Sequence, residues 1–139
     1  MSELVYVGID VAKSSFEVAV TGEVQTLRLG NDEAGYAELC QVLGPLAPRL
    51  VLLEATGGYE QDLALALAAA GLRVSVVNPR QARDFARCVG KLAKTDRIDA
   101  LALRDFAAML DAQGHEPRAL ADEQQRELTA LVTRRRQLV

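Results

Sequence analysis

One apolar run constrains the fold of this chain more than any other feature. The residues from Leu50 to Leu53 are all large and aliphatic, and a charged residue stands on either side of them. An uninterrupted run of this kind is typical of a strand covered by helices on both faces, whereas a strand with one solvated face alternates apolar and polar residues. The sequence therefore predicts a central strand over residues 49–54, ending at Glu54.

The segments around this run predict a regular series of elements. Strands are expected where apolar residues are continuous or alternate, and helices where they recur every three to four residues. The expected strands are 4–10, 16–20, 24–29, 49–54 and 73–77, with a turn at 21–23. The expected helices begin at Asn31, after the turn at 56–58, at the Asn78-Pro79 pair and at Asp96. Three strands followed by alternating helices and strands is the order of the ribonuclease-H-like fold. We predict a three-layer α/β domain with a mixed five-stranded sheet flanked by helices.

The end of the chain differs in character from the part before it. Residues 96–110 have helical apolar spacing, and a linker follows at 113–122. Residues 123–139 are charged, with leucine and valine at heptad-like spacing. We expect a domain over 1–112, then the linker, then the start of a coiled-coil-like helix over 123–139 that leads to a further carboxyl-terminal domain. His115 stands alone in the linker, and we expect it to be solvated.

Composition predicts a compact cytoplasmic domain. The chain has 139 residues, half of them hydrophobic and 4% aromatic, so its core should be aliphatic. A chain of this length buries roughly 68% of its unfolded surface. Cys40 and Cys88 match no metal-ligand spacing and favour a reducing compartment. The first seven residues lack a basic region followed by an apolar one, so we expect no signal sequence, and the longest apolar stretch, 63–72, is too short to span a bilayer.

Basic residues are concentrated in one segment although the net charge is -3. Six of them fall within residues 80–97, spaced so that a helix would place them on one side: Arg80, Arg83, Arg87, Lys91, Lys94 and Arg97. A solvated face kept soluble by charge is the alternative interpretation. We predict that this segment follows a nucleic-acid backbone.

Two acidic residues stand at the ends of predicted strands. Asp10 ends the first strand, where a carboxylate is costly unless a cation or a hydrogen bond compensates it. Glu54 directly follows the buried run, at the strand end where ligands bind in open α/β sheets. Each has a structural alternative: Asp10 could organise the following turn, and Glu54 could interact with the amino terminus of the next helix.

A second pair of acids, Asp96 and Asp99, is spaced by three residues, so in a helix both face the same way. Asp99 also falls on the stripe of Leu103, Phe106 and Leu110, which we expect to face inward. The alternative is that Asp96 caps the helix and Asp99 takes the reciprocal position of a capping box. Together with the two strand-end acids, these carboxylates suit divalent cations such as magnesium.

Four motifs carry a resemblance to a known family. They are GIDVAK at 8–13, EATGGY at 54–59, NP at 78–79 and KTDRIDA at 94–100. In this order they resemble the DEDD transposases of the IS-one-ten type, relatives of the Piv and MooV DNA invertases, over residues 4–112. The resemblance implies a RuvC-like nuclease domain that cleaves and transfers DNA strands during insertion-sequence transposition. It implies that Asp10, Glu54, Asp96 and Asp99 hold two magnesium ions, for which manganese can substitute.

The resemblance also implies partners and a missing part. The family has a carboxyl-terminal domain with a serine nucleophile, and a structured RNA from the element guides target choice. Ser14, Ser15 and Ser75 match no such nucleophile motif, so we expect it beyond Val139. We further expect DNA as the substrate, homo-oligomers formed through the carboxyl-terminal helix, and no complete recombination by this chain alone.

Other classes remain as alternatives. Actin-like kinases also begin with a Gly-Ile-Asp strand, but residues 11–15 lack the glycines of their phosphate loop, and the Asp96/Asp99 pair has no purpose there. A stand-alone RuvC-like junction nuclease is the nearest enzymatic alternative. A non-catalytic nucleic-acid-binding or assembly module would use the basic segment and the terminal helix, without need for four acids.

Overall fold

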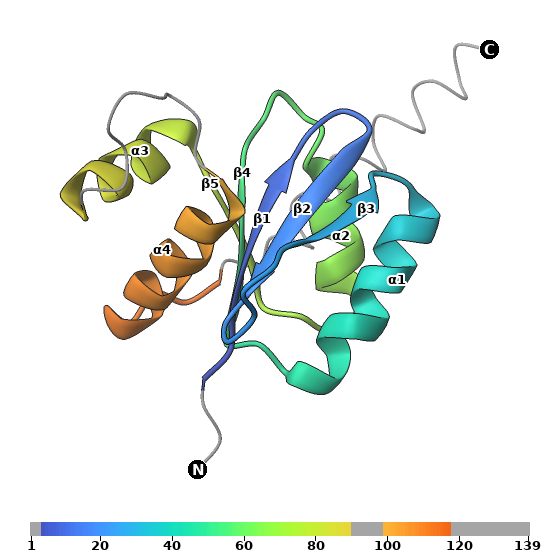
Figure 1. The fold of residues 1–139 in the computed structure, drawn as a ribbon, viewed down its shortest axis with the longest axis horizontal. Coiled ribbons are helices and arrows are strands. Elements are labelled where there is room, and N and C mark those ends of the chain that lie inside the picture. Colours follow the sequence, from blue (N-terminus) through green and yellow to red (C-terminus); the bar gives the residue numbers. More distant parts are fainter. Residues whose placement is uncertain (1–3, 90–98, 118–139) are drawn as a thin grey trace.

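A computed structural model describes residues 4–89 and 99–117 of the chain (Figure 1). The strands and helices follow one another in the predicted order. They are β1 (Tyr6–Val11), β2 (Ser15–Val20), β3 (Leu27–Gly30), α1 (Glu33–Leu43), a short 3-10 helix (Gly44–Leu46), β4 (Leu50–Glu54), α2 (Gln61–Ala69), β5 (Val74–Val77), α3 (Pro79–Cys88) and α4 (Ala100–Ala112).

The strands form one mixed sheet in the order β3-β2-β1-β4-β5. Strand β2 is antiparallel to both β1 and β3, whereas β4 runs parallel to both β1 and β5. All four residues of the run Leu50 to Leu53 are at most 1% exposed. The prediction of a mixed five-stranded sheet with a central, doubly covered β4 is confirmed.

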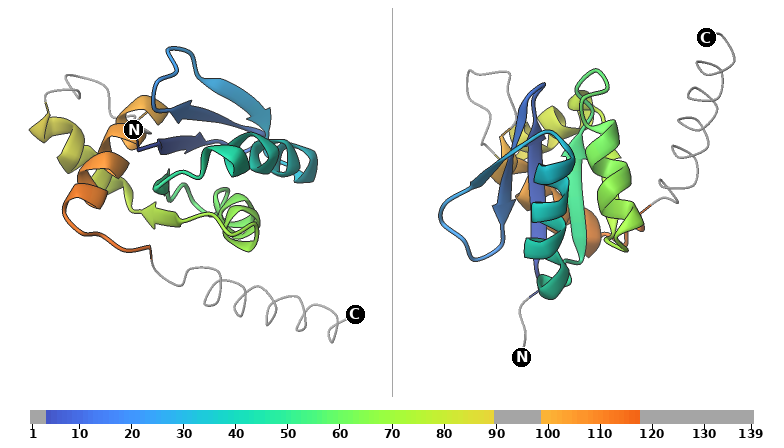
Figure 2. Two further views of the ribbon diagram at one scale, coloured as in Figure 1. Left: turned by 90° about the horizontal axis from the view of Figure 1, so that it is seen from below. Right: turned by 90° about the vertical axis from the view of Figure 1, so that its right-hand side faces the viewer.

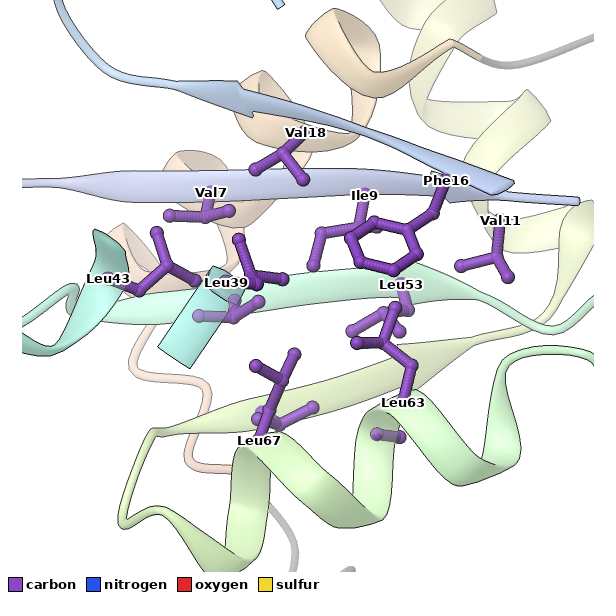
Figure 3. Packing of buried hydrophobic residues seen from close by; sticks show 13 residues of the cluster. Val7, Ile9, Val11, Phe16, Val18, Leu39, Leu43, Leu53, Leu63 and Leu67 are labelled. Carbon is purple, nitrogen blue, oxygen red and sulfur yellow. The ribbon is translucent and has the colours of Figure 1, made fainter. Parts of the chain in front are cut away.

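Helices cover both faces of the sheet, with α1 and α2 on one face and α3 and α4 on the other (Figures 1 and 2). Successive side chains of the central strands point to opposite faces of the sheet, and each face has its own apolar core. Val7 and Ile9 of β1 pack with Leu53 and with leucines of α1 and α2, as Figure 3 shows. Leu52 packs on the opposite face, against α3 and α4. The pleat therefore assigns every strand residue near the candidate site to one face.

Two element boundaries differ from those expected. Strand β3 begins at Leu27 rather than at residue 24, because only Leu27 to Gly30 pair with β2 and Val24 is 93% exposed in the connecting loop. Helix α1 is capped by Asp32, whose carboxylate accepts from the Gly35 amide at 2.8 Å, so Asn31 precedes the helix instead of opening it. The predicted start of α3 is confirmed, with a complete capping box at Asn78.

The last turn of α4 is tied to the amino-terminal ends of β1 and β4. The Asp111 carboxylate accepts a 2.6 Å hydrogen bond from the Tyr6 hydroxyl and forms a 3.1 Å ion pair with Arg49. These hydrogen bonds, from Tyr6 first and then from Arg49, lower the pKa of Asp111 below its usual value. Helix α4 is thus anchored at its far end by residues of β1 and of the segment leading into β4.

His115 takes part in this attachment, so the expectation that it is solvated and alone was wrong. Its side chain is half-buried, and Nε2 lies 3.1 Å from Oγ of Ser75 in β5. Next to it, Glu116 pairs with Arg73 at 3.0 Å. The chain turns back onto β5 after α4, a long-range contact that local composition does not indicate. None of the helices within the described ranges is long and apolar enough to cross a membrane.

Candidate active site

Asp10 and Glu54 stand at the carboxyl ends of neighbouring parallel strands. The register pairs Ile9 of β1 with Leu53 of β4, so the two acids occupy the next position on each strand. Both are half-buried. The sequence predicted a strand end for each acid separately, and the register shows in addition that the two strands are neighbours.

The contact between Gly8 and α4 shows which face the acids share. A Cβ atom at Gly8 would lie 2.2 Å from the backbone nitrogen of Arg104 and 2.3 Å from the carbonyl oxygen of Ala100. Gly8 therefore faces the first turn of α4, and Asp10, two residues later, faces the same way. Glu54 follows Leu52 with the same parity, and Leu52 packs on the α3–α4 face. Both carboxylates therefore belong to the face on which α4 begins.

Asp99 is the amino-terminal cap of α4. Its backbone is extended, with φ -90° and ψ 173°, and its carboxylate accepts from the Ala102 amide at 2.8 Å. The helix therefore begins at Ala100, and the expectation of a helix already running from Asp96 through Asp99 was wrong, because Asp99 itself does the capping. The prediction that Leu103 and Phe106 face inward is confirmed, since both are at most 5% exposed. Asp99 is exposed at the end of α4 that contacts β1.

The acids supply the oxygen ligands that hard cations prefer. In Asp99, the capping hydrogen bond from Ala102 is accepted by Oδ1. Within residues 4–89 and 99–117, however, no three acidic, histidine or cysteine side chains lie close enough together to hold a metal ion. Asp96 falls outside these residues. The donor chemistry fits magnesium or manganese, and the assembly of all four acids into one site stays a prediction.

A further acid beside Asp10 was missed by the sequence reasoning. Glu17 of β2 pairs in register with Asp10 and so shares its face. Glu17 also pairs in register with Arg28 of β3, and the ion pair between these two side chains offsets the charge of Glu17. Alternation along residues 16–20 made Glu17 look like a solvent-facing position. The short connection between β1 and β2 would have indicated its proximity to Asp10.

Two residues of the surrounding loops, Asn31 and Glu60, were not singled out either. Glu60 is 4% exposed, which is unusual for a carboxylate, and it directly precedes α2. Asn31 hydrogen-bonds to the loops after both acid-bearing strands. Only the tertiary arrangement of these loops reveals either residue.

The basic segment is described in part. Arg80, Arg83 and Arg87 are exposed on α3, while Lys91, Lys94 and Arg97 lie outside the described residues. Asp84 stands between them and approaches Arg87 at 4.0 Å. Because α3 ends at Cys88, only the first three basic residues share this helix.

The fold is that of the RuvC nuclease. A solved structure of Thermus thermophilus RuvC matches with a TM-score of 0.62 at 18% identity, covering 82% of this chain and 99% of that chain. T. thermophilus RuvC in complex with a Holliday junction substrate matches with a TM-score of 0.58 at 16% identity, covering 83% of this chain and 99% of that chain. The prediction of a RuvC-like fold is confirmed for the described part.

Sequence relatives identify the family. The pilin gene-inverting protein of Moraxella lacunata is 30% identical over 94% of this chain, and that of Moraxella bovis is 29% identical over the same share. The chain spans 41% of the length of each of these relatives. Residues 7–139 match the DEDD family of the IS-one-ten (IS110) type, described as transposase. The chain belongs to this family of DEDD transposases.

Proposed function

We propose that this chain is the amino-terminal catalytic domain of a DNA transposase or recombinase that cleaves and transfers phosphodiester bonds with divalent cations. The observation that carries the proposal is the placement of Asp10 and Glu54 at adjacent parallel strand ends, on the face where Asp99 caps α4. Membership of the transposase family and the RuvC-like fold support it.

The four acids are the ligands in this proposal, with Asp96 joining Asp10, Glu54 and Asp99. Two bound magnesium ions would activate the nucleophile and stabilise the leaving oxygen. The protein's contribution is to hold carboxylates from β1 and β4 on one face of the sheet. Helix α4 brings Asp99 to that face, because its first turn contacts β1 at Gly8.

The basic residues have a purpose in the same proposal. A phosphodiester must approach a group of carboxylates that repel it, so nearby cations lower the cost of binding. Arg80, Arg83 and Arg87 form an exposed row on α3, which packs beside α4. We propose that this row, continued by Lys91, Lys94 and Arg97, contacts the nucleic-acid backbone.

The remaining parts of the proposal concern the longer protein. Because the chain spans 41% of the relatives' length, the serine nucleophile is proposed to lie in a carboxyl-terminal domain. A structured guide RNA and homo-oligomers formed through residues 123–139 complete this proposal. The 139-residue chain alone is then expected to leave strand exchange incomplete.

Calorimetry with manganese tests the metal site. Asp10→Asn and Asp99→Asn should each weaken manganese binding by about tenfold or more, since each removes a charged ligand. Asp62→Asn is the matched control, because Asp62 is an exposed acid on α2, on the other side of the sheet. Affinity equal to that of the wild type in both site variants would contradict the assignment.

A stand-alone junction nuclease is the second candidate, and one observation favours it. The RuvC structures are matched over 99% of their own length by this chain, including a RuvC solved with a Holliday junction. Incubation of the 139-residue chain with a labelled four-way junction and magnesium separates the two candidates. Cleavage of the junction by this chain alone would favour the nuclease over the transposase domain.

A further inference from the structure

We propose that Asn31 is a positioning residue that fixes the separation between the loops that follow Asp10 and Glu54. This inference rests on the proposed metal-dependent function. It concerns a residue outside the four acids, located between β3 and α1. The strands β1 and β4 pair directly, but the loops that follow them extend beyond the paired residues, and Asn31 contacts both loops there.

The Asn31 side chain joins both loops directly. Its Nδ2 donates to the Ala12 carbonyl at 2.9 Å and to the Tyr59 carbonyl at 3.1 Å. Its Oδ1 accepts a 2.6 Å hydrogen bond from the Tyr36 hydroxyl. Because carbonyl oxygens can only accept, the nitrogen of the amide must face Ala12 and Tyr59. One half-buried amide thus bridges the loop after β1 and the loop after β4.

The bridge reaches the first acid through a short, ordered turn. Ala12 lies two residues after Asp10, and its amide donates to the Ser15 carbonyl at 2.8 Å. The backbone N–H of Asn31 also donates to this turn, to the Ser14 carbonyl at 3.0 Å. Displacement of Asn31 would therefore displace the whole turn that leaves β1 at Asp10.

The loop after Glu54 is held together by the buried carboxylate of Glu60. Oε1 of Glu60 accepts from the Thr56 amide at 2.8 Å and from the Gly58 amide at 3.1 Å. Gly57 and Gly58 have positive φ angles, 76° and 109°, which suit glycine and permit this tight turn. A contact at Tyr59 is consequently transmitted along the loop to Glu54.

Asn31 is itself held in place on the α1 side. Gly35 lets α1 approach β3 closely, since a Cβ atom there would lie 1.8 Å from the Gly30 oxygen. Tyr36, which donates to Asn31, stacks on Phe16 of β2 with ring centroids 6.3 Å apart. The donor groups of Asn31 are therefore oriented before any ion or substrate binds, which is the requirement for a positioning residue.

Asn31→Leu tests the inference, because leucine has a similar size but neither donor nor acceptor. We expect manganese affinity, measured by calorimetry on the folded 139-residue chain, to fall about tenfold or more, as for losses of ligand-orienting groups. Thr21→Val is the control for a merely structural effect. It removes the hydrogen bonds between the Thr21 hydroxyl and the Tyr6 backbone at the opposite end of β1, away from both acids and from α4, and its manganese affinity should equal that of the wild type.

The outcomes separate this inference from the proposed function. Wild-type affinity in Asn31→Leu, together with lost affinity in Asp10→Asn, overturns the role of Asn31 and leaves the metal site standing. Failure of the wild-type chain to bind manganese overturns both. If Asn31→Leu does not fold, Asn31→Ser decides, since its hydroxyl can retain one donated bond; an intermediate loss supports the inference, and unchanged affinity overturns it.

Discussion

Gly8 is the residue at which the sheet and α4 come closest. Three backbone atoms of α4 lie within 2.7 Å of the position that a Cβ atom would take. Backbone atoms of a helix cannot move individually, so a side chain at this position would displace the whole helix. Because Asp10 follows on the same strand and Asp99 precedes Ala100, Gly8 controls the distance between the elements that carry these acids.

Gly8→Ala should lower the free energy of unfolding by about 2 kcal/mol or more, since overpacking a filled interior typically costs this much. Urea denaturation gives the measurement. Gly44→Ala is the control, because Gly44 has φ -51° and no atom within 4 Å of its Cβ position. Similar losses of stability in the two variants would show that the approach of α4 to β1 is looser than described.

Single residues also show what the sequence can and cannot predict. Asp10 and Glu54 are recognisable because each ends an apolar strand, a local signal. Asn31 and Glu60 are not, because their partners are backbone groups of turns whose conformation depends on glycine φ angles and on loops that meet only in the folded chain. The proposed ligands carry a local signal in the sequence, and the groups proposed to orient them do not.

Among the helices, α3 has an apolar face that packs on the rest of the domain and a basic face that is exposed. Ala82, Phe85 and Ala86 are buried, and Phe85 stacks on Phe106 of α4 with centroids 4.7 Å apart. Arg80 and Arg87 are exposed on the remaining surface. The apolar side chains of α3 therefore fix it against α4, while Arg80 and Arg87 lie on the exposed side of the helix.

Replacing Arg80, Arg83 and Arg87 together by glutamine should weaken binding to DNA and RNA of any sequence about equally. If all six basic residues contact phosphates, the slope of log affinity against log salt is roughly -5 for the wild type, and the triple variant should lose roughly half of it. Phosphate contacts carry little sequence information, so no base preference should change. Fluorescence anisotropy over a range of salt concentrations makes the measurement. An unchanged affinity and slope would mean that this row is only a solvated face.

Element boundaries were harder to predict than the elements themselves. Both Asp96 and Asp99 have the side chain of a helix cap, and the apolar spacing that follows is compatible with either as the start. The contact of Ala100 with β1 makes the later start favourable, and this contact is tertiary. Strand β3 was similarly overextended, because an edge strand with exposed side chains has no burial pattern to limit it.

At the scale of the whole molecule, the sheet separates the candidate site from an anchoring edge. Asp10 and Glu54 lie at the carboxyl ends of β1 and β4, whereas Asp111 at the end of α4 and His115 after it bind residues at or near the opposite ends of the strands. Helix α4 is thereby fixed at both ends, by Gly8 at its start and by the Asp111 contacts at its finish. This arrangement explains how an exposed cap such as Asp99 can have a defined position relative to the sheet.

The topology could be predicted because the order of elements and the apolar run of β4 admit few arrangements. The same arrangement occurs in T. thermophilus RuvC at 18% identity, so packing requirements rather than particular side chains maintain it. The proposed site needs more than topology. Its described acids, Asp10, Glu54 and Asp99, come from β1, β4 and the amino-terminal cap of α4, and their separation depends on close contacts such as that of Gly8.

Anomalous diffraction from crystals of the chain grown with manganese tests the proposed metal site most directly. We expect manganese peaks within coordinating distance of carboxylate oxygens of Asp10 and Glu54, with Asp96 and Asp99 completing the ligands. Crystals of Asp10→Asn, treated in the same way, should lose these peaks. Well-ordered crystals whose manganese peaks lie elsewhere, with none between β1 and β4, would contradict the assignment of this site.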